Sequence, residues 1–142
     1  MTRDSTRLAE PPRAVVVDAS VAVEFLDGNP AWVTQWEAWV ADGTILLAPQ
    51  IFPLEVANAL LRGKQFSAAD AQNRLTRLLD SGLEPSDRGM RGLFESIQLA
   101  EKHRLTVYDA AYLQIALEVE ADVATTDVAL ANAAAREGLA VV

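Results

Sequence analysis

Four acidic residues lie at points of the sequence where a strand is expected to end or a helix to begin. They are Asp18 in VVVDAS, Glu55 in PLEVANAL, Asp109 in VYDAAY and Asp127 in ATTDVAL, each flanked by apolar residues. Burying an unpaired carboxylate costs several kcal/mol, so a fold that gathers four of them must neutralise them with protons or cations. The simplest interpretation is a site for Mg²⁺ or Mn²⁺, because these hard cations prefer oxygen ligands and commonly serve phosphoryl chemistry.

The composition excludes several other kinds of site. The chain has 142 residues, 51% of them hydrophobic, which is enough for one domain with a buried core. It has no cysteine, which excludes disulfides, thiolate zinc sites and thiol nucleophiles. The net charge of −8 argues against a protein that binds nucleic acid broadly through the backbone, since that would need a basic face. An enzyme that meets RNA through metal ions and a few arginines stays possible.

The N-terminal segment carries charges but no hydrophobic stretch, so it is not a secretory signal. We expect residues 1–13 to form a flexible tail and residues 14–142 to form one domain. No apolar run reaches the length of a membrane span. These features predict a cytoplasmic protein that does not contact a membrane.

Short apolar runs alternate with helical patterns along the chain. Strands are expected at 14–17, 45–48, 83–84, 123–125 and 140–142, and helices at 20–27, 31–41, 50–62, 67–81, 87–103, 107–120 and 128–137. Alternation of this kind predicts an α/β fold with a parallel sheet covered by helices on both faces. In such sheets, binding sites form at the carboxyl ends of the strands.

The acids fall close to that edge of the predicted sheet. Asp18 ends the first strand, Asp127 follows a later one, Asp109 opens a helix and Glu55 lies one turn inside another. Each has a simpler interpretation, because the three aspartates could cap helices and Glu55 could pair with Arg62. The order of the four residues and their local sequences favour a shared site.

That order resembles the PIN domain and, within it, the VapC toxins of bacterial toxin–antitoxin modules. The similar segments are VVVDASVAVEFL, PLEVANALLR, LTVYDAAYLQIAL and ATTDVALANAA. The resemblance implies a PIN-like fold of about five parallel strands flanked by about seven helices. It also implies that Asp18, Glu55, Asp109 and Asp127 form the catalytic and metal-binding cluster, assisted by Ser20, Asn58 and Thr126.

The function that the resemblance implies is a Mg²⁺- or Mn²⁺-dependent endoribonuclease acting as the toxin of a type II pair. A VapB-type antitoxin would inhibit it, and the protein would form a homodimer. Asp18 and Asp109 would be the principal metal ligands, Glu55 would bind metal or position the attacking water, and Asp127 would hold a second ion or act through a water. The sequence does not identify the RNA that is cleaved.

Three tryptophans recur at helical spacing, at Trp32, Trp36 and Trp39. This spacing is typical of a helix face that packs against the domain. Tryptophan is also enriched in protein interfaces, so a surface for the antitoxin is a second interpretation. The spacing alone does not decide between core and interface.

Other enzyme classes with an aspartate after the first strand fit less well. A haloacid-dehalogenase-like phosphatase needs a second aspartate two residues later, where this chain has Ser20. A phosphoacceptor receiver domain needs a late lysine after a strand, but Lys64 and Lys102 lie in helical contexts. A non-catalytic PIN-fold binding protein and a housekeeping PIN nuclease remain as alternatives.

Overall fold

The computed structural model describes residues 13–142, and short apolar runs form its central sheet. The strands are β1 (Ala14–Val17), β2 (Ile45–Pro49), β3 (Glu84–Ser86) and β4 (Asp122–Ala124). They pair in parallel in the order β3-β2-β1-β4, so all four carboxyl ends lie at one edge. Val15, Val16 and Val17 are fully buried, as expected for a central strand covered on both faces.

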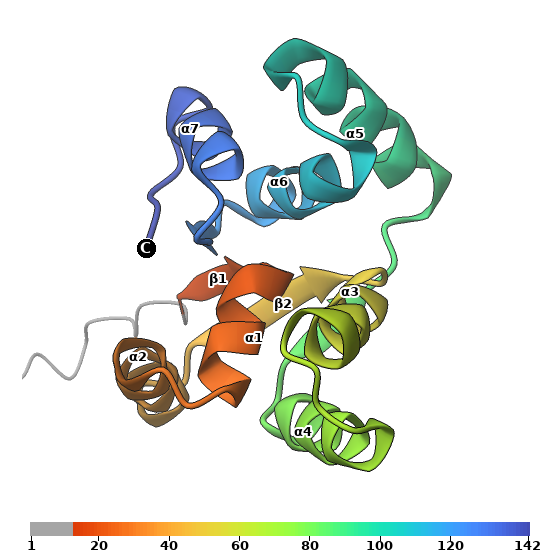
Figure 1. Ribbon diagram of the computed structural model, residues 1–142. Coiled ribbons are helices and arrows are strands. Elements are labelled where there is room, and N and C mark those ends of the chain that lie inside the picture. The colour runs from red at the N-terminus through yellow and green to blue at the C-terminus, as the bar shows by residue number, and fades with distance from the viewer. Residues whose placement is uncertain (1–12) are drawn as a thin grey trace, which may run out of the picture.

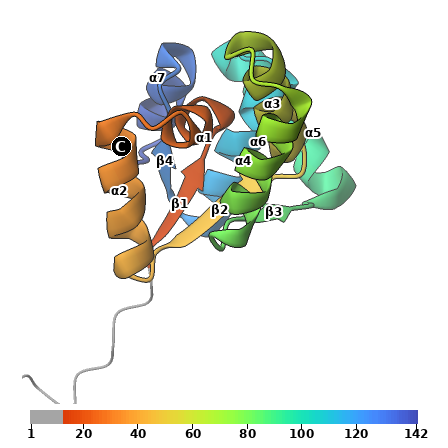
Figure 2. The same ribbon diagram turned by 60° about the horizontal axis from the view of Figure 1, so that its bottom comes forward.

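Helices cover both sides of this sheet. They are α1 (Ala19–Leu26), α2 (Pro30–Ala41), α3 (Phe52–Asn58), α4 (Ala68–Asp80), α5 (Gly89–His103), α6 (Val107–Val119) and α7 (Val128–Arg136). Figure 1 shows α1 to α4 on one side and α5 to α7 on the other, with α6 against the sheet. Figure 2 shows the strands side by side beneath the helices. The predicted parallel α/β architecture is therefore confirmed.

The sheet differs from the expectation at one end. It has four strands in the described residues rather than about five, because the predicted strand at 140–142 is reduced to a single parallel bridge between Val141 and Val123. The Val123 N–H donates to the Ala140 carbonyl, and its carbonyl accepts from the Val142 N–H, both at 2.9 Å. Two hydrogen bonds are too few to extend this segment into a full strand.

The helix predicted at 50–62 is also not uniform. The α-helical part ends at Asn58, and a π-helical turn, η1 (Ala59–Gly63), follows it. The Lys64 N–H bonds to the Ala59 carbonyl five residues earlier, at 2.9 Å. Such wider turns are rare and often lie near functional sites.

The tryptophan stripe belongs to the core. The exposed fractions of Trp36 and Trp39 are only 2% and 4%, and Trp32 is partly buried against the same core. The rings of Phe25 and Trp36 stack with centroids 4.3 Å apart, which joins α2 to α1. The stripe therefore holds α2 on the domain through Trp36 and Trp39, and only Trp32 stays partly exposed.

The predicted flexible tail, residues 1–13, lies outside the described residues except for Arg13. The Arg13 carbonyl accepts from the Ile45 N–H at 2.8 Å, and its guanidinium pairs with Asp122. Arg13 thus contacts the starts of β2 and β4. Among residues 13–142, no helix is both long and apolar enough to cross a bilayer.

Candidate active site

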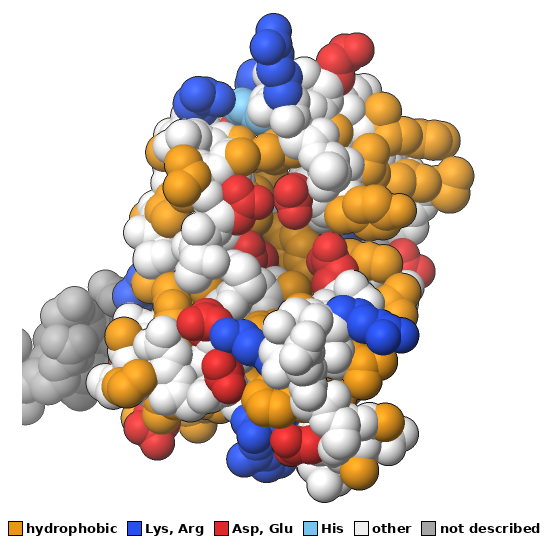
Figure 3. Space-filling view, viewed as in Figure 1, with side chains coloured by type: hydrophobic (Ala, Val, Ile, Leu, Met, Phe, Trp, Pro, Cys, Tyr) orange, Lys and Arg blue, Asp and Glu red, His pale blue; other side chains and the backbone are white. Residues whose placement is uncertain are grey.

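The four predicted acids lie at or next to the carboxyl edge of the sheet. Asp18 directly follows β1, and Asp127 lies in the loop between β4 and α7. Glu55 lies in the first turn of α3, shortly after β2, and Asp109 lies in the first turn of α6. Figure 3 shows acidic side chains gathered in a hollow between the two halves of the molecule, with apolar surface beside it. The topology alone therefore brings these distant segments together.

Asp18 is the most deeply held of the four, with an exposed fraction of 6%. Its Oδ1 accepts from the Ser20 hydroxyl at 2.5 Å and from the Val21 N–H at 3.2 Å, and its Oδ2 accepts from the Thr125 hydroxyl. Burial raises the pKa of Asp18 above its ordinary value, and the charge of Asp127 raises it further, although the three hydrogen bonds act in the opposite direction. The side chain is fixed in place but is costly to ionise.

The loop that follows β4 is tied to the first turn of α1. The Thr125 hydroxyl accepts from the Asp127 N–H at 2.9 Å, and the Thr126 N–H donates to the Ser20 hydroxyl oxygen at 3.1 Å. Asp127 itself caps α7, because its Oδ1 accepts from the Ala129 N–H at 2.9 Å. The capping interpretation of Asp127 is thus confirmed, and its second carboxylate oxygen is not used by that cap.

Glu55 is half-buried and has a partner that the sequence did not reveal. The Tyr112 hydroxyl donates to Glu55 Oε1 at 2.5 Å across the gap between α6 and α3. Burial raises the pKa of Glu55, and the charges of Asp109 and Asp18 add to this, while the Tyr112 hydrogen bond opposes it. Burial and the nearby carboxylate also raise the pKa of Tyr112, so that it stays a protonated donor. The only available signal was that Tyr112 follows Asp109 by three residues, on the same helix face.

Asp109 has the fewest contacts of the four. The Thr106 hydroxyl accepts from its N–H at 3.0 Å, which confirms the predicted helix start. Its carboxylate has one polar side-chain contact in residues 13–142, with the Thr106 hydroxyl. Burial raises the pKa of Asp109, and so does the charge of Asp127, while the contact with Thr106 lowers it. The chain has therefore left this carboxylate available for a ligand.

Repulsion links the four acids into one electrostatic unit. Asp127 raises the pKa of both Asp18 and Asp109, and Glu55 is affected by Asp18 and Asp109. Within the described chain, no three acidic or histidine side chains are arranged to hold an ion as they stand. Hydrogen bonds hold Asp18 towards Thr125 and Glu55 towards Tyr112. A donor set made only of carboxylate oxygens under mutual repulsion fits a hard divalent cation in its chemistry.

The three residues expected to assist the acids are placed differently from one another. Ser20 contacts Asp18 directly, as stated above. Thr126 is exposed and reaches the site only through its backbone, whereas the neighbouring Thr125 makes the side-chain contact. Asn58 is exposed at the end of α3 and makes no side-chain hydrogen bond to residues 13–142. The sequence offered a signal for Thr125, because a threonine hydroxyl often accepts a hydrogen bond from the backbone N–H two residues later.

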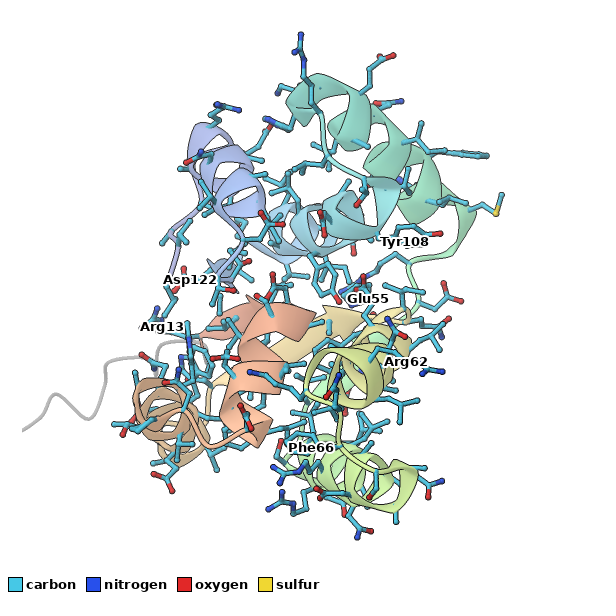
Figure 4. The ribbon with its side chains drawn as sticks, in the orientation of Figure 1. Arg13, Glu55, Arg62, Phe66, Tyr108 and Asp122 are labelled. Carbon is cyan, nitrogen blue, oxygen red and sulfur yellow. The ribbon has the colours of Figure 1, made fainter. Side chains whose placement is uncertain are left out.

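The predicted alternative partner of Glu55 is not used. Arg62 is exposed on η1 and forms no ion pair with Glu55 or with any other acid in residues 13–142. Figure 4 shows Glu55 between Arg62 on one side and Tyr108, at the start of α6, on the other. No arginine in residues 13–142 forms an ion pair with Glu55.

Comparison with known proteins identifies the fold and the family. The chain resembles PAE2754 from Pyrobaculum aerophilum with a TM-score of 0.68 and 22% identity, over 91% of this chain and 83% of that one. It resembles VapBC2 from Rickettsia felis, bound to a DNA fragment from their promoter, with a TM-score of 0.69 and 16% identity, over 91% of this chain and 97% of that one. No curated protein sequence matches the chain. The sequence model of the PIN domain matches residues 15–136, most of the chain, and the protein therefore belongs to the PIN domain family, whose members are generally nucleases that use divalent metal ions.

Proposed function

We propose that this protein is a Mg²⁺- or Mn²⁺-dependent endoribonuclease whose catalytic and metal-binding residues are Asp18, Glu55, Asp109 and Asp127. The observation that supports this most strongly is the set of four carboxylates that repel one another at the sheet edge, three of them with raised pKa values. Such a cluster is costly for stability unless a cation or protons neutralise it. A divalent ion bound during catalysis would offset this cost and so explain why the chain carries the cluster.

When bound, divalent ions supply charge stabilisation for the phosphate and a water acidic enough to attack it. Asp18 and Asp109 would be the principal ligands, and Asp127 would contribute the oxygen that its helix cap leaves unused. Glu55 Oε1 is held by Tyr112, which leaves Oε2 to position the attacking water and take its proton. Water adds to phosphorus, the bond to the leaving oxygen breaks, and that oxygen takes up a proton from solvent.

The polar residues around the acids would orient them. Ser20 and Thr125 fix the plane of the Asp18 carboxylate through hydrogen bonds. Hydrogen bonds of this kind orient metal ligands. Thr126 would act through its N–H on Ser20. Asn58, exposed beside the hollow, would contact the phosphate or a bound water rather than an acid.

We further propose that the protein is the VapC-like toxin of a type II toxin–antitoxin pair, inhibited by a VapB-type antitoxin in the cytoplasm. The likeness to VapBC2 over 97% of that chain supports this partner class. We also propose a homodimer, supported by an exposed apolar face on α5 that consists of Met90, Leu93, Phe94 and Ile97. Contiguous apolar patches of this kind commonly mark protein interfaces.

The test is cleavage of a mixed cellular RNA pool by the purified protein with Mg²⁺ or Mn²⁺, with a chelator, and after Asp18→Asn. We expect discrete fragments that disappear with the chelator and in the variant. Asp42→Asn, an exposed aspartate at the end of α2, is the matched control and should cut normally. Cleavage that survives Asp18→Asn would refute the assigned site.

The same experiment separates the alternatives. A folded protein that binds Mn²⁺ and cuts no RNA would support the non-catalytic PIN-fold binding protein. Cleavage that continues when the candidate antitoxin from the adjacent reading frame is added would support a housekeeping nuclease. Fragments whose ends map to one site would identify the RNA.

A further inference from the structure

A pocket of about 270 Å³ opens beside the acid-lined hollow. It lies between the carboxyl ends of β2 and β3 and the facing helices α5 and α6, with Pro49, Ile51, Ser86 and Tyr108 in its walls. Tyr108 directly precedes Asp109, and Ile51 directly precedes α3, which carries Glu55. These two residues adjoin Asp109 and α3 in the sequence, although none of the four acids lines the pocket itself. Its volume lies just below the roughly 300–1,000 Å³ of drug-sized sites, which suits one ring system.

An exposed aromatic ring stands at the rim of this pocket. The exposed fraction of Tyr108 is 60%, although it lines the pocket. Figure 4 shows it at the start of α6, on the side of the hollow opposite Arg62. Leu93 and Val107 add apolar wall next to it. A planar apolar ligand would find a stacking surface here.

The inner wall of the pocket presents a hydrogen-bond acceptor. The Gln114 side chain is 3% exposed, and its amide nitrogen donates to Glu95 Oε1 at 2.9 Å and to Glu118 Oε1 at 3.2 Å. Because both partners are acceptors, the amide can take only this orientation, with Oε1 on the other side. Oε1 lies 3.3 Å from the position that a Cβ on Gly92 would occupy, and Gly92 lines the pocket. No residue from 13 to 142 donates to it.

A second polar atom in the same wall also lacks a partner. Arg88 lines the pocket and pairs through Nη1 with Glu118 at 2.7 Å, but its Nε–H is buried with no acceptor. Buried donors without a partner are rare in folded proteins. The pocket wall thus combines the unpaired Gln114 acceptor with apolar surface, while the unpaired Arg88 Nε–H is enclosed within the protein.

We propose that this pocket receives one unpaired nucleobase of the RNA, next to the phosphate that is cleaved. Tyr108 stacks on the base, and Gln114 Oε1 accepts a hydrogen bond from a base N–H. This inference rests on the proposed function. In a duplex these N–H groups are already paired, so the pocket would select an unpaired nucleotide. An aliphatic side chain from a protein partner fits less well, because it would bury the Gln114 acceptor without a donor.

The test compares wild type, Tyr108→Ala and Gln114→Met on an RNA that the protein cuts at one mapped site. Each is assayed on the intact RNA and on versions in which the nucleotide on either side of the cut is abasic. We expect one abasic RNA to lower kcat/KM of the wild type by about tenfold or more, the usual scale of base stacking on an aromatic ring. On intact RNA, the kcat/KM of Tyr108→Ala should fall by a similar factor. On the abasic RNA it should fall little further, because both changes remove the same contact.

Gln114→Met keeps the length of the side chain but removes the whole amide, both the acceptor and the donor to Glu95 and Glu118. We expect a loss of about threefold to tenfold on intact RNA and little further loss on the abasic RNA. Gln98→Met is the matched control, since Gln98 is an exposed glutamine on α5 that lines a different pocket, and it should leave kcat/KM unchanged. Thermal melts verify that each variant is folded.

Three outcomes would overturn the proposal. Equal cleavage of intact and abasic RNA by a protein that needs metal and Asp18 would refute the base pocket while leaving the nuclease intact. Variants that cut normally but change the mass in light scattering, or lose the antitoxin, would identify the pocket as a protein docking site. A wild-type protein that cuts no RNA under any metal condition would refute the proposed function and this inference together.

Discussion

The two halves of the candidate site hold the same functional group in different ways. We define the fixed half as Asp18, Ser20, Thr125 and Asp127, and the open half as Glu55, Asp109 and Tyr112. In the fixed half, three hydrogen-bond donors orient the buried Asp18. A hydrogen bond from the Thr126 N–H to the Ser20 hydroxyl ties the β4–α7 loop to α1. In the open half, Glu55 has one donor, the Tyr112 hydroxyl, and the Asp109 carboxylate has only the Thr106 hydroxyl as a polar side-chain contact in the described chain.

This difference shows which side chains the fold itself holds in place and which ones need a bound ligand to fix their positions. The fixed half lies between adjacent parallel strands, β1 and β4, whose pairing sets the distance between Asp18 and Thr125. The open half lies on two helices that face each other across the hollow. We infer that the fixed half is preorganised and that the open half adjusts when an ion and substrate bind.

The largest effect is expected where both halves are needed. Asp18→Asn and Asp109→Asn should each lower RNA cleavage by more than about a hundredfold, because each removes a proposed metal ligand. Initial rates on one mapped RNA at saturating Mn²⁺ measure this, with Asp42→Asn as the control. Normal activity of Asp109→Asn would show that this carboxylate is not needed, and it would contradict the assignment of the open half to the active site.

The second prediction compares the supporting hydroxyls. Thr125→Val leaves the buried Asp18 without one donor and the Asp127 N–H without its acceptor. We expect activity to fall about 10- to 100-fold and stability to fall by about 1–3 kcal/mol in urea unfolding. Tyr112→Phe should cost less than about tenfold, because water can replace the donor at the half-buried Glu55. The reverse order would contradict the distinction between the two halves.

The third prediction concerns pH. The folded-state pKa of Asp109 is raised, so its carboxyl is favourable for folding below the unfolded pKa of about 3.9, and that contribution is lost as pH rises through the folded value. Asp109→Asn should therefore match wild type near pH 4 and become more stable at neutral pH. The gain should be small, because the group is partly exposed and solvent screens its charge.

Urea unfolding in chelator at several pH values measures this difference. Adding Mn²⁺ at neutral pH should reverse the order, since only the wild type keeps the proposed ligand. A constant difference across the pH range would show that the pKa of Asp109 is not raised in the folded protein.

The smallest effect is expected at Thr126. Its side chain is exposed, and its contact with Ser20 uses the backbone N–H, which alanine retains. Thr126→Ala should change the free energy of unfolding by less than about 0.5 kcal/mol and leave cleavage nearly unchanged. A loss of activity as large as that of Thr125→Val would mean that the Thr126 hydroxyl contacts the substrate.

Local signals predicted the elements that carry the site. Ser67 and Thr106 stand at the starts of the predicted helices 67–81 and 107–120, and each hydroxyl accepts from an N–H three residues later, at 3.1 Å and 3.0 Å. The valine run of β1 and the placement of the acids near strand ends followed from burial and parallel topology. The catalytic roles assigned to the four acids stay predictions.

Features that depend on tertiary packing were not predictable in the same way. The contact between Tyr112 and Glu55 joins residues 57 positions apart, so it depends on how α6 packs near α3. The spacing of Trp32, Trp36 and Trp39 fits a buried face and an interface equally well, and only the stack on Phe25 decides between them. Gly63 directly follows the predicted helix 50–62, yet the left-handed residue in this segment is Gln65, with φ of 59°.

The π turn at Ala59–Gly63 marks the place where this chain can best gain or lose a residue. Its closing bond spans five residues instead of four, so it holds one residue more than an α-helical turn. Deleting that residue would leave Glu55 upstream in place but would rotate the following chain by about 100°. Lys64 would then leave Glu24 and Asp27, which it contacts at 2.9 Å and 3.0 Å. We therefore expect relatives to differ in length at this turn. Such a difference would alter the path of the chain to α4 but would leave Glu55 on α3 in place.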